Sequence, residues 1–116
     1  MPDMAGYYTL FKSEKSGEWY FNLKAGNHET ILQSEGYTSR AGAENGIESV
    51  RENGTEAARF DRRESSVPNY WFVLKAGNGQ IIGKSEMYPD ARSRDKGIES
   101  VKTNAPTTEV KDKSEG

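Results

Sequence analysis

Apolar and polar residues alternate along several short runs of this chain. In residues 19–24 the side chains of Trp19, Phe21 and Leu23 take every second position, so an extended backbone places them on one face. Residues 70–75 repeat the same alternation. Each run therefore predicts a β-strand with one face in the core and the other turned away from it. Shorter runs predict further strands at residues 8–12, 30–34, 59–64, 81–85 and 108–111.

Two longer segments carry a helical period instead. Ala43, Ile47 and Val50 recur at i, i+4 and i+7, which places them on one stripe of a helix. Ser39 and Asp90 precede the two segments and are good N-caps, because their side-chain oxygens can accept backbone N–H groups of the first turn. Each segment ends at a candidate terminator in the left-handed conformation, namely Asn53 and Asn104.

An internal duplication explains why this pattern occurs twice. At a fixed offset of 51 residues, 16 of the 33 positions from 21 to 53 are identical to those from 72 to 104. Both copies keep a glycine inside the helix, Gly46 and Gly97, where glycine costs about 1 kcal/mol relative to alanine. We therefore expect a close approach at this point of each helix, made either by the sheet or by the twin helix.

The duplication predicts a single α+β domain over residues 1–116. The first copy covers residues 7–56 and the second residues 57–111, and residues 112–116 are expected to form a disordered tail. A three-stranded sheet with one helix is only marginally stable, so the copies should pair about a pseudo-twofold axis and bury their apolar faces together. A monomer is expected, because the duplication itself supplies the twofold partner.

The repeated motifs resemble those of a known family. Leu-Lys-Ala-Gly-Asn at residues 23–27, Ser-Glu-Gly-Tyr at 34–37 and Ala-Glu-Asn-Gly-Ile-Glu-Ser-Val at 43–50 are similar to the YegP-like family, the tandem form of domain of unknown function 1508 (uncharacterised protein family 0339). The resemblance implies two β3-α-β units in one continuous antiparallel sheet. It also implies that both helices lie on one face and that the strand after each helix is exchanged into the other unit. It implies no established activity and no catalytic or binding residue.

Composition narrows the class of protein further. The 116 residues include no cysteine, so neither a disulfide nor thiol chemistry is available. The formal net charge of −2 gives no overall attraction to nucleic acid or anionic membranes, although it is compatible with a local basic patch. No basic and apolar leader opens the chain, and no apolar run approaches the ~18 residues of a membrane span. We expect a cytoplasmic protein of a kind common in bacteria, with no membrane partner.

No catalytic residue, metal ligand set or cofactor site is predicted. His28, the single histidine, lies in a predicted turn, and no cluster of His or Cys accompanies it. The carboxylates Glu35 and Glu86, and likewise Glu48 and Glu99, are retained in both copies. We interpret them first as cap or surface residues, with acid–base chemistry or cation binding as the alternative. An enzyme is not expected, although the sequence leaves that question open.

The outward side of the two alternating strands is the leading candidate for a binding surface. Aromatic and basic side chains share this side, and the adjoining turns could present backbone N–H groups to an anion or simply fix the turn geometry. The predicted surface consists of Tyr20, Trp71, Lys24, Lys75, Asn27 and Asn78. Arg59, Arg62 and Arg63 form a local basic cluster, which we interpret as a charged strand edge because Asp61 and Glu64 interleave with it.

The leading functional hypothesis is a non-enzymatic module that binds a protein or peptide through this aromatic sheet face. Single-stranded nucleic acid is an alternative occupant of the same face, because aromatic rings beside cationic side chains can stack bases. A small-molecule or enzymatic site on the pseudo-twofold axis is a third hypothesis. A pocket at the axis lined by both copies would favour the third, whereas a flat aromatic face would favour the first.

Overall fold

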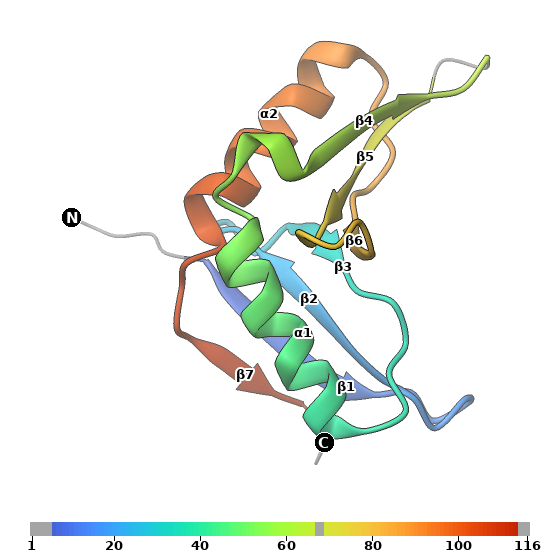
Figure 1. Ribbon diagram of the computed structural model, residues 1–116, viewed down its shortest axis with the longest axis vertical. Helices are drawn as coiled ribbons and strands as arrows, with labels where there is room; N and C mark the ends of the chain where they lie inside the picture. The colour runs from blue at the N-terminus through green and yellow to red at the C-terminus, as the bar shows by residue number, and fades with distance from the viewer. Residues whose placement is uncertain (1–5, 67–68, 114–116) are drawn as a thin grey trace.

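A single seven-stranded sheet carries two helices on one of its faces (Figure 1). The computed structural model describes residues 6–66 and 69–113. The strands are β1 (Tyr7–Lys12), β2 (Trp19–Lys24), β3 (Thr30–Gln33), β4 (Phe60–Glu64), β5 (Tyr70–Lys75), β6 (Ile81–Lys84) and β7 (Val110–Asp112). The helices are α1 (Arg40–Asn53), α2 (Ala91–Asn104) and the single 3-10 turn η1 (Ala57–Arg59). The predicted α+β class is confirmed.

The two copies meet in the middle of the sheet. The strands follow the order β4-β5-β6-β3-β2-β1-β7, so β3 of the first copy lies beside β6 of the second. Gln33 pairs with Lys84 across this junction, and the two residues are one repeat offset of 51 positions apart. The pseudo-twofold axis therefore passes through the sheet between Gln33 and Lys84, and the sheet is continuous as predicted.

The strand after each helix joins the other half of the sheet, which confirms the predicted exchange. β4 follows α1 and pairs with β5, whereas β7 follows α2 and pairs with β1. The β1–β7 pair is parallel, so the sheet is mixed and not antiparallel throughout as expected. The reason is that β1 occupies the place beside β2 that matches the place of β4 beside β5. β7 is therefore placed one strand further out.

Both helices begin at the predicted caps. Ser39 Oγ accepts the N–H of Gly42 at 3.0 Å, and Asp90 Oδ1 accepts the N–H of Ser93 at 2.8 Å. The hydrogen bond from the Ser93 backbone lowers the pKa of the Asp90 carboxyl. Each cap satisfies a backbone donor that the helix itself leaves without a partner.

The predicted helix ends were wrong in conformation. Among the described residues other than glycine, His28 alone has a positive φ, so neither Asn53 nor Asn104 is left-handed. Their side-chain amides instead donate to the carbonyls of Ser49 and Ser100, at 2.9 and 2.8 Å. The chain then continues into a further right-handed turn after each helix.

The core lies between the helices and the sheet, on the face predicted for it. Fully buried side chains on β2 and β5 form its centre: Phe21, Leu23, Phe72 and Leu74. The apolar stripes of both helices and the isoleucines of β3 and β6 complete it: Ala43, Ile47, Val50, Ile98, Val101, Ile31 and Ile82. Trp19 and Tyr70 are half-buried at the strand ends. Alternation along the strands therefore predicted the buried face correctly.

The helix glycines approach the sheet side and not the twin helix. A Cβ at Gly46 would overlap the Tyr37 hydroxyl and stand 2.8 Å from Cε2 of Phe21. The Tyr37 ring stacks on Phe21, with centroids 6.1 Å apart and planes 18° from parallel. A Cβ at Gly97 would overlap the Tyr88 hydroxyl in the same way. These tyrosines fill the edge of the core, and the absent side chain of each glycine makes room for them.

Small residues also let the two copies approach each other near the axis. Leu32 lies against Gly83, where a Cβ would stand 2.6 Å from the Leu32 Cδ2 atom. These two residues are repeat equivalents, so one copy supplies a side chain and the other supplies the space for it. Gly54 and Ala105 are also equivalents, and a Cβ at Gly54 would stand 2.6 Å from that of Ala105. The two copies thus share one core.

The last strand extends into the segment that the sequence assigned to the tail. β7 extends to Asp112, and the Lys113 N–H donates to the Leu10 carbonyl at 2.7 Å. Of the predicted tail, residues 114–116 lie outside the described residues. Asp112 and Lys113 therefore belong to the edge of the sheet.

Candidate functional site

Both helices pack on the face that carries Phe21 and Phe72, so no helix of the described chain covers the other face. The strand registers define a row of neighbours across that face, from β1 to β4: Thr9, Asn22, Gln33, Lys84, Val73 and Asp61. We call this row, together with the side chains on the same side of each strand, the open face. The axis passes through its centre, between Gln33 and Lys84.

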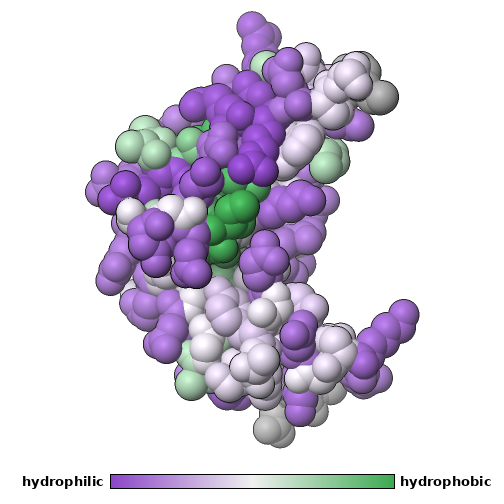
Figure 2. Space-filling model, turned by 45° about the vertical axis from the view of Figure 1, so that its right-hand side comes forward, coloured by the Kyte–Doolittle hydropathy of each residue, from purple (hydrophilic) through white to green (hydrophobic). Residues whose placement is uncertain are grey.

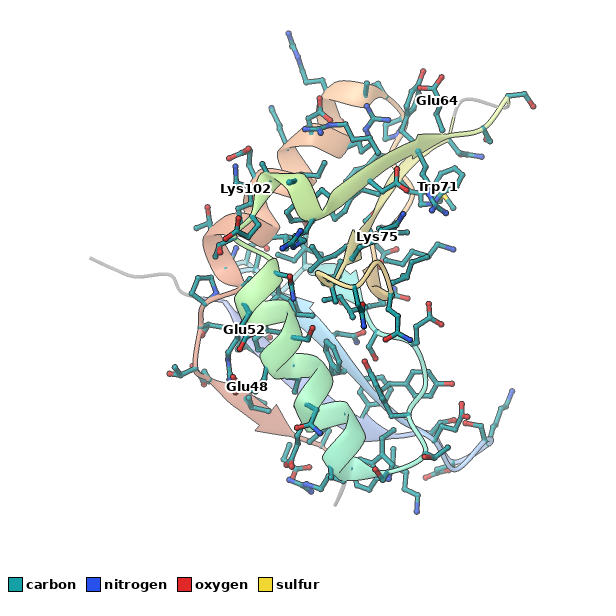
Figure 3. The ribbon with its side chains drawn as sticks, viewed as in Figure 1. Glu48, Glu52, Glu64, Trp71, Lys75 and Lys102 are labelled. Carbon is teal, nitrogen blue, oxygen red and sulfur yellow. The ribbon has the colours of Figure 1, made fainter. Side chains whose placement is uncertain are left out.

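The predicted surface residues of β2 and β5 lie on the open face. Tyr20 and Lys24 share one side of β2, and Trp71 and Lys75 share the same side of β5. β3 and β6 separate these strands, so Tyr20 and Trp71 lie in different halves of the face and do not form one cluster. Figure 3 shows Trp71 toward the right edge of the molecule and Glu48 of α1 on its left side.

Two aromatic residues of β1 extend the face in the first copy. The Phe11 ring stacks on Tyr20, with centroids 5.9 Å apart and planes 17° from parallel. The Lys111 ammonium lies 4.4 Å from the centroid of the Tyr7 ring. Both pairs use ring surface that would otherwise be open to a ligand. Trp71 in the second copy has Arg63 as its cross-strand neighbour.

The strand positions of the open face carry more cations than acids. The cationic side chains are Lys24, Arg63, Lys75, Lys84 and Lys111, and the acidic one is Asp61. The Asp61 carboxylate lies 3.0 Å from Arg63 and 3.3 Å from Lys75, and hydrogen bonds from Arg63 and then Lys75 lower its pKa. Glu18 and Glu86 stand at the margins, each accepting a hydrogen bond from an open-face side chain. A chain of net charge −2 thus presents a locally positive sheet face.

The two turn asparagines bond to their own turns. Asn27 Oδ1 accepts the N–H of Glu29 at 3.1 Å, and Asn78 Oδ1 accepts the N–H of Gln80 at 3.0 Å. These are the side-chain-to-backbone bonds of an Asx turn. His28, between the first pair, takes the left-handed conformation with φ of 73°. Of the two roles considered for these asparagines, the contacts correspond to fixing the turn.

Three of the retained carboxylates each bond one polar or cationic side chain. Glu86 Oε2 accepts a hydrogen bond from Gln33 Nε2 at 2.9 Å. Glu48 and Glu99 are exposed on the two helices and pair with Arg51 and Lys102 one turn later. In the described ranges, no three His, Cys, Asp or Glu side chains gather closely enough to hold a metal ion. Neither described helix has the length and hydropathy needed to cross a lipid bilayer.

Two adjoining grooves lie beside the axis, between the β2–β3 turn and α2. Their volumes are about 380 and 220 Å³, and they share Glu29, Ile31 and Tyr88, so both copies contribute to the lining. Burial, followed by the charges of Glu86 and Glu29, raises the pKa of the Tyr88 phenol. Figure 2 shows a hollow on one side of the molecule with apolar side chains at its base. The sequence raised a pocket at the axis in the third hypothesis but did not name these lining residues, because they depend on the register that brings β3 to β6.

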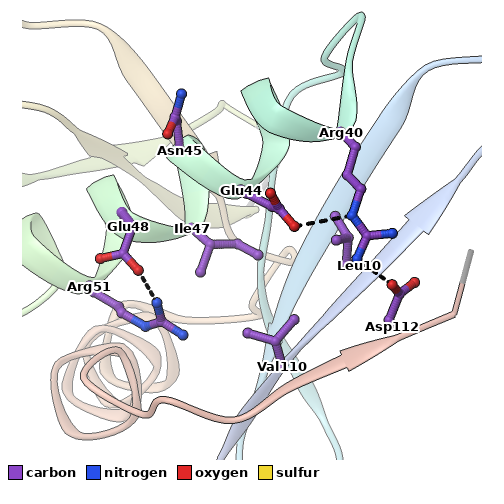
Figure 4. Close-up of a pocket in the computed structure, with 9 residues that line it drawn as sticks. All are labelled: Leu10, Arg40, Glu44, Asn45, Ile47, Glu48, Arg51, Val110 and Asp112. Atoms are coloured by element: carbon purple, nitrogen blue, oxygen red, sulfur yellow. Dashed lines mark hydrogen bonds and ion pairs between the residues drawn. The ribbon is translucent and has the colours of Figure 1, made fainter.

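A further pocket of about 370 Å³ lies between α1 and β7 (Figure 4). Its floor is apolar and consists of Leu10, Ile47 and Val110. At its rim Arg40 bonds to Glu44 of its own helix at 3.1 Å and to Asp112 of β7. Arg40 therefore links α1 to the edge strand β7, because it bonds to one carboxylate on each of them.

The sequence of this chain matches a described protein family over most of its length. The family "Domain of unknown function (DUF1508)" matches residues 14–61 and again residues 66–112. The chain belongs to the DUF1508 family. Each match begins in the loop or turn before a central strand, β2 or β5, and reaches the exchanged strand, β4 or β7. The second match therefore includes all of β7, and the first includes the beginning of β4.

Relatives of the DUF1508 chain carry no described activity in their names. The UPF0339 protein YegP of Escherichia coli O157:H7 is 52% identical over 109 residues, which cover 94% of this chain and 98% of the relative. A UPF0339 protein of the ptx operon 5' region in Stutzerimonas stutzeri is 47% identical over 107 residues, covering 92% and 96%. The solution NMR structure of yegP from E. coli, a protein of unknown function, superposes with a TM-score of 0.91 at 47% identity, covering 100% of this chain and 99% of that one. A UPF0339 protein from Shewanella oneidensis gives 0.89 at 47% identity, covering 95% and 92%.

Proposed function

We propose that this protein is a non-enzymatic interaction module that binds a protein or peptide partner through the open face. One observation carries the proposal: a sheet face without a helix displays part-exposed aromatic side chains among cationic ones. Aromatic residues are favoured in protein interfaces because they bury a large area with few rotatable bonds. The module acts as a monomer, since the second copy already completes the sheet.

Contacts within the open face favour a polypeptide over a nucleic acid. Base stacking needs an open ring surface. Tyr20 already stacks on Phe11, and the Lys111 ammonium lies over Tyr7. Glu18 and Glu86 at the margins would repel a continuous phosphate backbone, whereas a polypeptide can place its own charges to suit them.

Single-stranded nucleic acid remains the alternative for the same face. Five cations against one acid on the strand positions favour it, because phosphate contacts supply most of the affinity of such complexes. Trp71, with Arg63 beside it, is the residue on which a base would stack. Binding of this kind weakens steeply with salt, which separates it from a polypeptide interface.

A small-molecule or enzymatic site is the third candidate, supported by the grooves that both copies line beside the axis. Their shared residue Tyr88 offers a phenol, and Glu29 and Glu86 offer carboxylates. A small ligand of this site would be recognised by hydrogen bonding to these three groups. A small ligand needs a groove that shields it from water. A protein partner does not, because the partner itself excludes water from its contact with the open face.

The test is a capture experiment from native lysate with three forms of the full chain. Wild type is compared with the Tyr20→Ala/Trp71→Ala variant, which truncates one aromatic residue in each half of the open face. Met87→Ala is the matched control, since Met87 is 51% exposed and lies outside the strands. We expect a protein that binds wild type and the control but not the double variant, with and without nuclease treatment.

Other outcomes assign the face differently. Loss of all captured material after nuclease treatment, together with a steep salt dependence, assigns the face to nucleic acid. Equal capture by wild type and by the double variant contradicts the proposal, provided that both melt at similar temperatures. Binding of a small metabolite that shifts Tyr88 signals, and not those of Trp71, favours the groove.

A further inference from the structure

The two outer edges of the sheet are pseudo-equivalent, but among the described residues a strand covers only one of them. Tyr8 pairs with Leu23 as Phe60 pairs with Leu74, and Leu10 pairs with Phe21 as Arg62 pairs with Phe72. The axis therefore relates β1 to β4. β7 covers the outer edge of β1, whereas β4 ends the sheet on its own side. The outer edge of β4 is thus the twin of a site that is known to hold a strand.

The β1–β7 contact shows how such a strand is held. The Tyr8 N–H donates to the Glu109 carbonyl at 2.9 Å, and the Leu10 carbonyl accepts the Lys113 N–H at 2.7 Å. The peptide groups of Tyr8 and Leu10 therefore point outward, away from β2. By the shared register, the peptide groups of their twins Phe60 and Arg62 point outward from β4.

The beginning of the twin site is already filled by the chain itself. The Phe60 N–H donates to the carbonyl of Ala57 in η1, just as the Tyr8 N–H donates to Glu109. η1 therefore takes the place of Glu109. The Phe60 carbonyl and both peptide groups of Arg62 come next along the edge, and these are the groups that a parallel strand would bond.

The charges around the edge point to the chemistry of the missing strand. In the first copy, Arg40 lies over the Trp19 ring and bonds to two carboxylates, Glu44 of α1 and Asp112 of β7. In the second copy, Arg94 lies over the equivalent Tyr70 ring, 5.4 Å from its centroid. The second arrangement repeats the first, with the arginine supplied one helical turn later.

In the part of the chain that the structure describes, one carboxylate bonds to the arginines of the second arrangement. Asp95, the equivalent of Glu44, bonds to Arg62 at 2.9 Å and to Arg94 at 3.3 Å. Two guanidinium groups thus share one acid, which leaves an excess positive charge at the position that Asp112 occupies in the other half. The Arg62 side chain is half exposed, at 50%, so an incoming carboxylate can reach its guanidinium group.

We propose that the outer edge of β4 takes up an extended segment of a partner protein as an added parallel strand. Its residues are apolar, basic and acidic in that order, as in Val110, Lys111 and Asp112 of β7. The apolar residue lies beside Phe60, the basic one beside Asp61, and the acidic one beside Arg62. Main-chain bonds supply the attachment, and the pair between the acidic residue and Arg62 supplies the selection. The attachment uses the outward peptide groups of β4 and the Arg62 side chain, and not the aromatic side chains of the open face, so the inference does not depend on the function proposed above.

The charges on β4 explain why this edge selects its partner. An exposed apolar edge strand pairs with many chains, and charged side chains on the edge suppress such pairing. Leu10 of the covered edge is replaced by Arg62 on the uncovered one. A strand without an acid in the matching position would therefore leave the two arginines without a second counter-charge.

The experiment uses the full chain labelled with 15N and a capped peptide, Thr-Glu-Val-Lys-Asp-Lys, with the sequence of residues 108–113. We expect saturable shifts of the amides of residues 57–64 and of the first turns of α2. A control peptide with lysine in place of the aspartate should bind about tenfold more weakly, since a charge-assisted pair becomes a repulsive one.

Two variants separate the main chain from the charge. Arg62→Pro removes an outward N–H, which an edge strand tolerates, and should abolish the shifts. Arg62→Leu restores the residue of the covered edge and should bind both peptides alike. Shifts confined to β1 and Arg40, no saturable shift with wild type, or unchanged binding by Arg62→Pro would each overturn the proposal. Self-association of wild type that Arg62→Pro removes would also overturn it, because it assigns the edge to a second copy of the chain.

Discussion

The hydroxyl of Tyr37 occupies the space that a side chain on Gly46 would need. Alanine at this position gains about 1 kcal/mol in helix propensity. Its methyl group would overlap the hydroxyl and press on Phe21, and overpacking of a core costs about 1–3 kcal/mol. We expect the Gly46→Ala variant to lose up to about 2 kcal/mol of unfolding free energy, measured by urea denaturation.

A double variant identifies the hydroxyl as the cause. Tyr37→Phe removes the oxygen that the new methyl group meets, so Gly46→Ala/Tyr37→Phe should lose less than the sum of the two single losses. Strict additivity would show that Gly46 is retained for a reason other than its contact with Tyr37. The same cycle applies to Gly97 and Tyr88 in the second copy.

Adjacent residues of β5 test which face of the sheet is the core. Phe72 is fully buried against the helices, whereas Trp71 lies on the open face and is only partly buried. Phe72→Ala should therefore lower the free energy of unfolding by about 3–5 kcal/mol, as for other buried phenylalanines. Trp71→Ala should leave the melting temperature nearly unchanged. A loss below about 1 kcal/mol for Phe72→Ala would contradict this assignment of faces.

The sequence predicted those features that depend on local pattern. Alternation along β2 identified the side that carries Phe21 and Leu23, and the side-chain chemistry of Ser39 and Asp90 located both helix starts. These succeed because burial period and capping are decided within a few residues. The ends at Asn53 and Asn104 failed because a tertiary contact, the meeting of the two helix ends, decides them.

Features that depend on the register between strands could not be predicted from the sequence. Lys84 and Lys111 join the open face only because β6 and β7 take particular places in the sheet, and nothing local encodes those places. The net charge of −2 therefore concealed a positive face. Tyr20 and Trp71 were correctly placed on one side of their strands, but their separation depends on the two strands between them.

Tyr8 connects alkaline stability to the contact between the copies. Its ring is fully buried, its hydroxyl donates to the Ala105 carbonyl at 2.8 Å, and burial strongly raises the pKa of the phenol. Because the folded pKa lies above the unfolded value of about 10, the folded state holds the proton more tightly. The stability from this group is complete below that pH and is lost as the pH rises beyond it.

We therefore expect melting temperature to fall above pH ~10 and the fall to be shallower in Tyr8→Phe. At neutral pH that variant should lose about 1 kcal/mol, the usual net value of one hydrogen bond. Some alkaline sensitivity should persist, because burial also raises the pKa of Tyr37 and Tyr88. An unchanged alkaline profile in Tyr8→Phe would show that Tyr8 does not couple folding to pH.

Leu32 and Gly83 allow a test of the pseudo-twofold axis itself. Gly83→Leu should destabilise the protein by overpacking against Leu32, and Leu32→Gly should destabilise it by leaving a cavity. The combined exchange, Leu32→Gly/Gly83→Leu, moves the side chain to its symmetry-related place. It should be more stable than either single variant, as measured by thermal unfolding. If the exchange were as unstable as the sum of both changes, the surroundings of the two positions would not be equivalent.

The same asymmetry predicts how the two halves behave when separated. Residues 1–56 carry Leu32 and residues 57–116 carry Gly83, so a pair of first halves would bring two leucines to the axis and a pair of second halves would leave a void there. Each half alone should therefore give a poorly dispersed NMR spectrum without cooperative melting, whereas an equimolar mixture should fold as a heterodimer. A well-dispersed spectrum from monomeric residues 1–56 would contradict the shared core. A stable homodimer of either half would contradict the role assigned to Leu32 and Gly83, because the axis would then accept two equal residues as readily as a complementary pair.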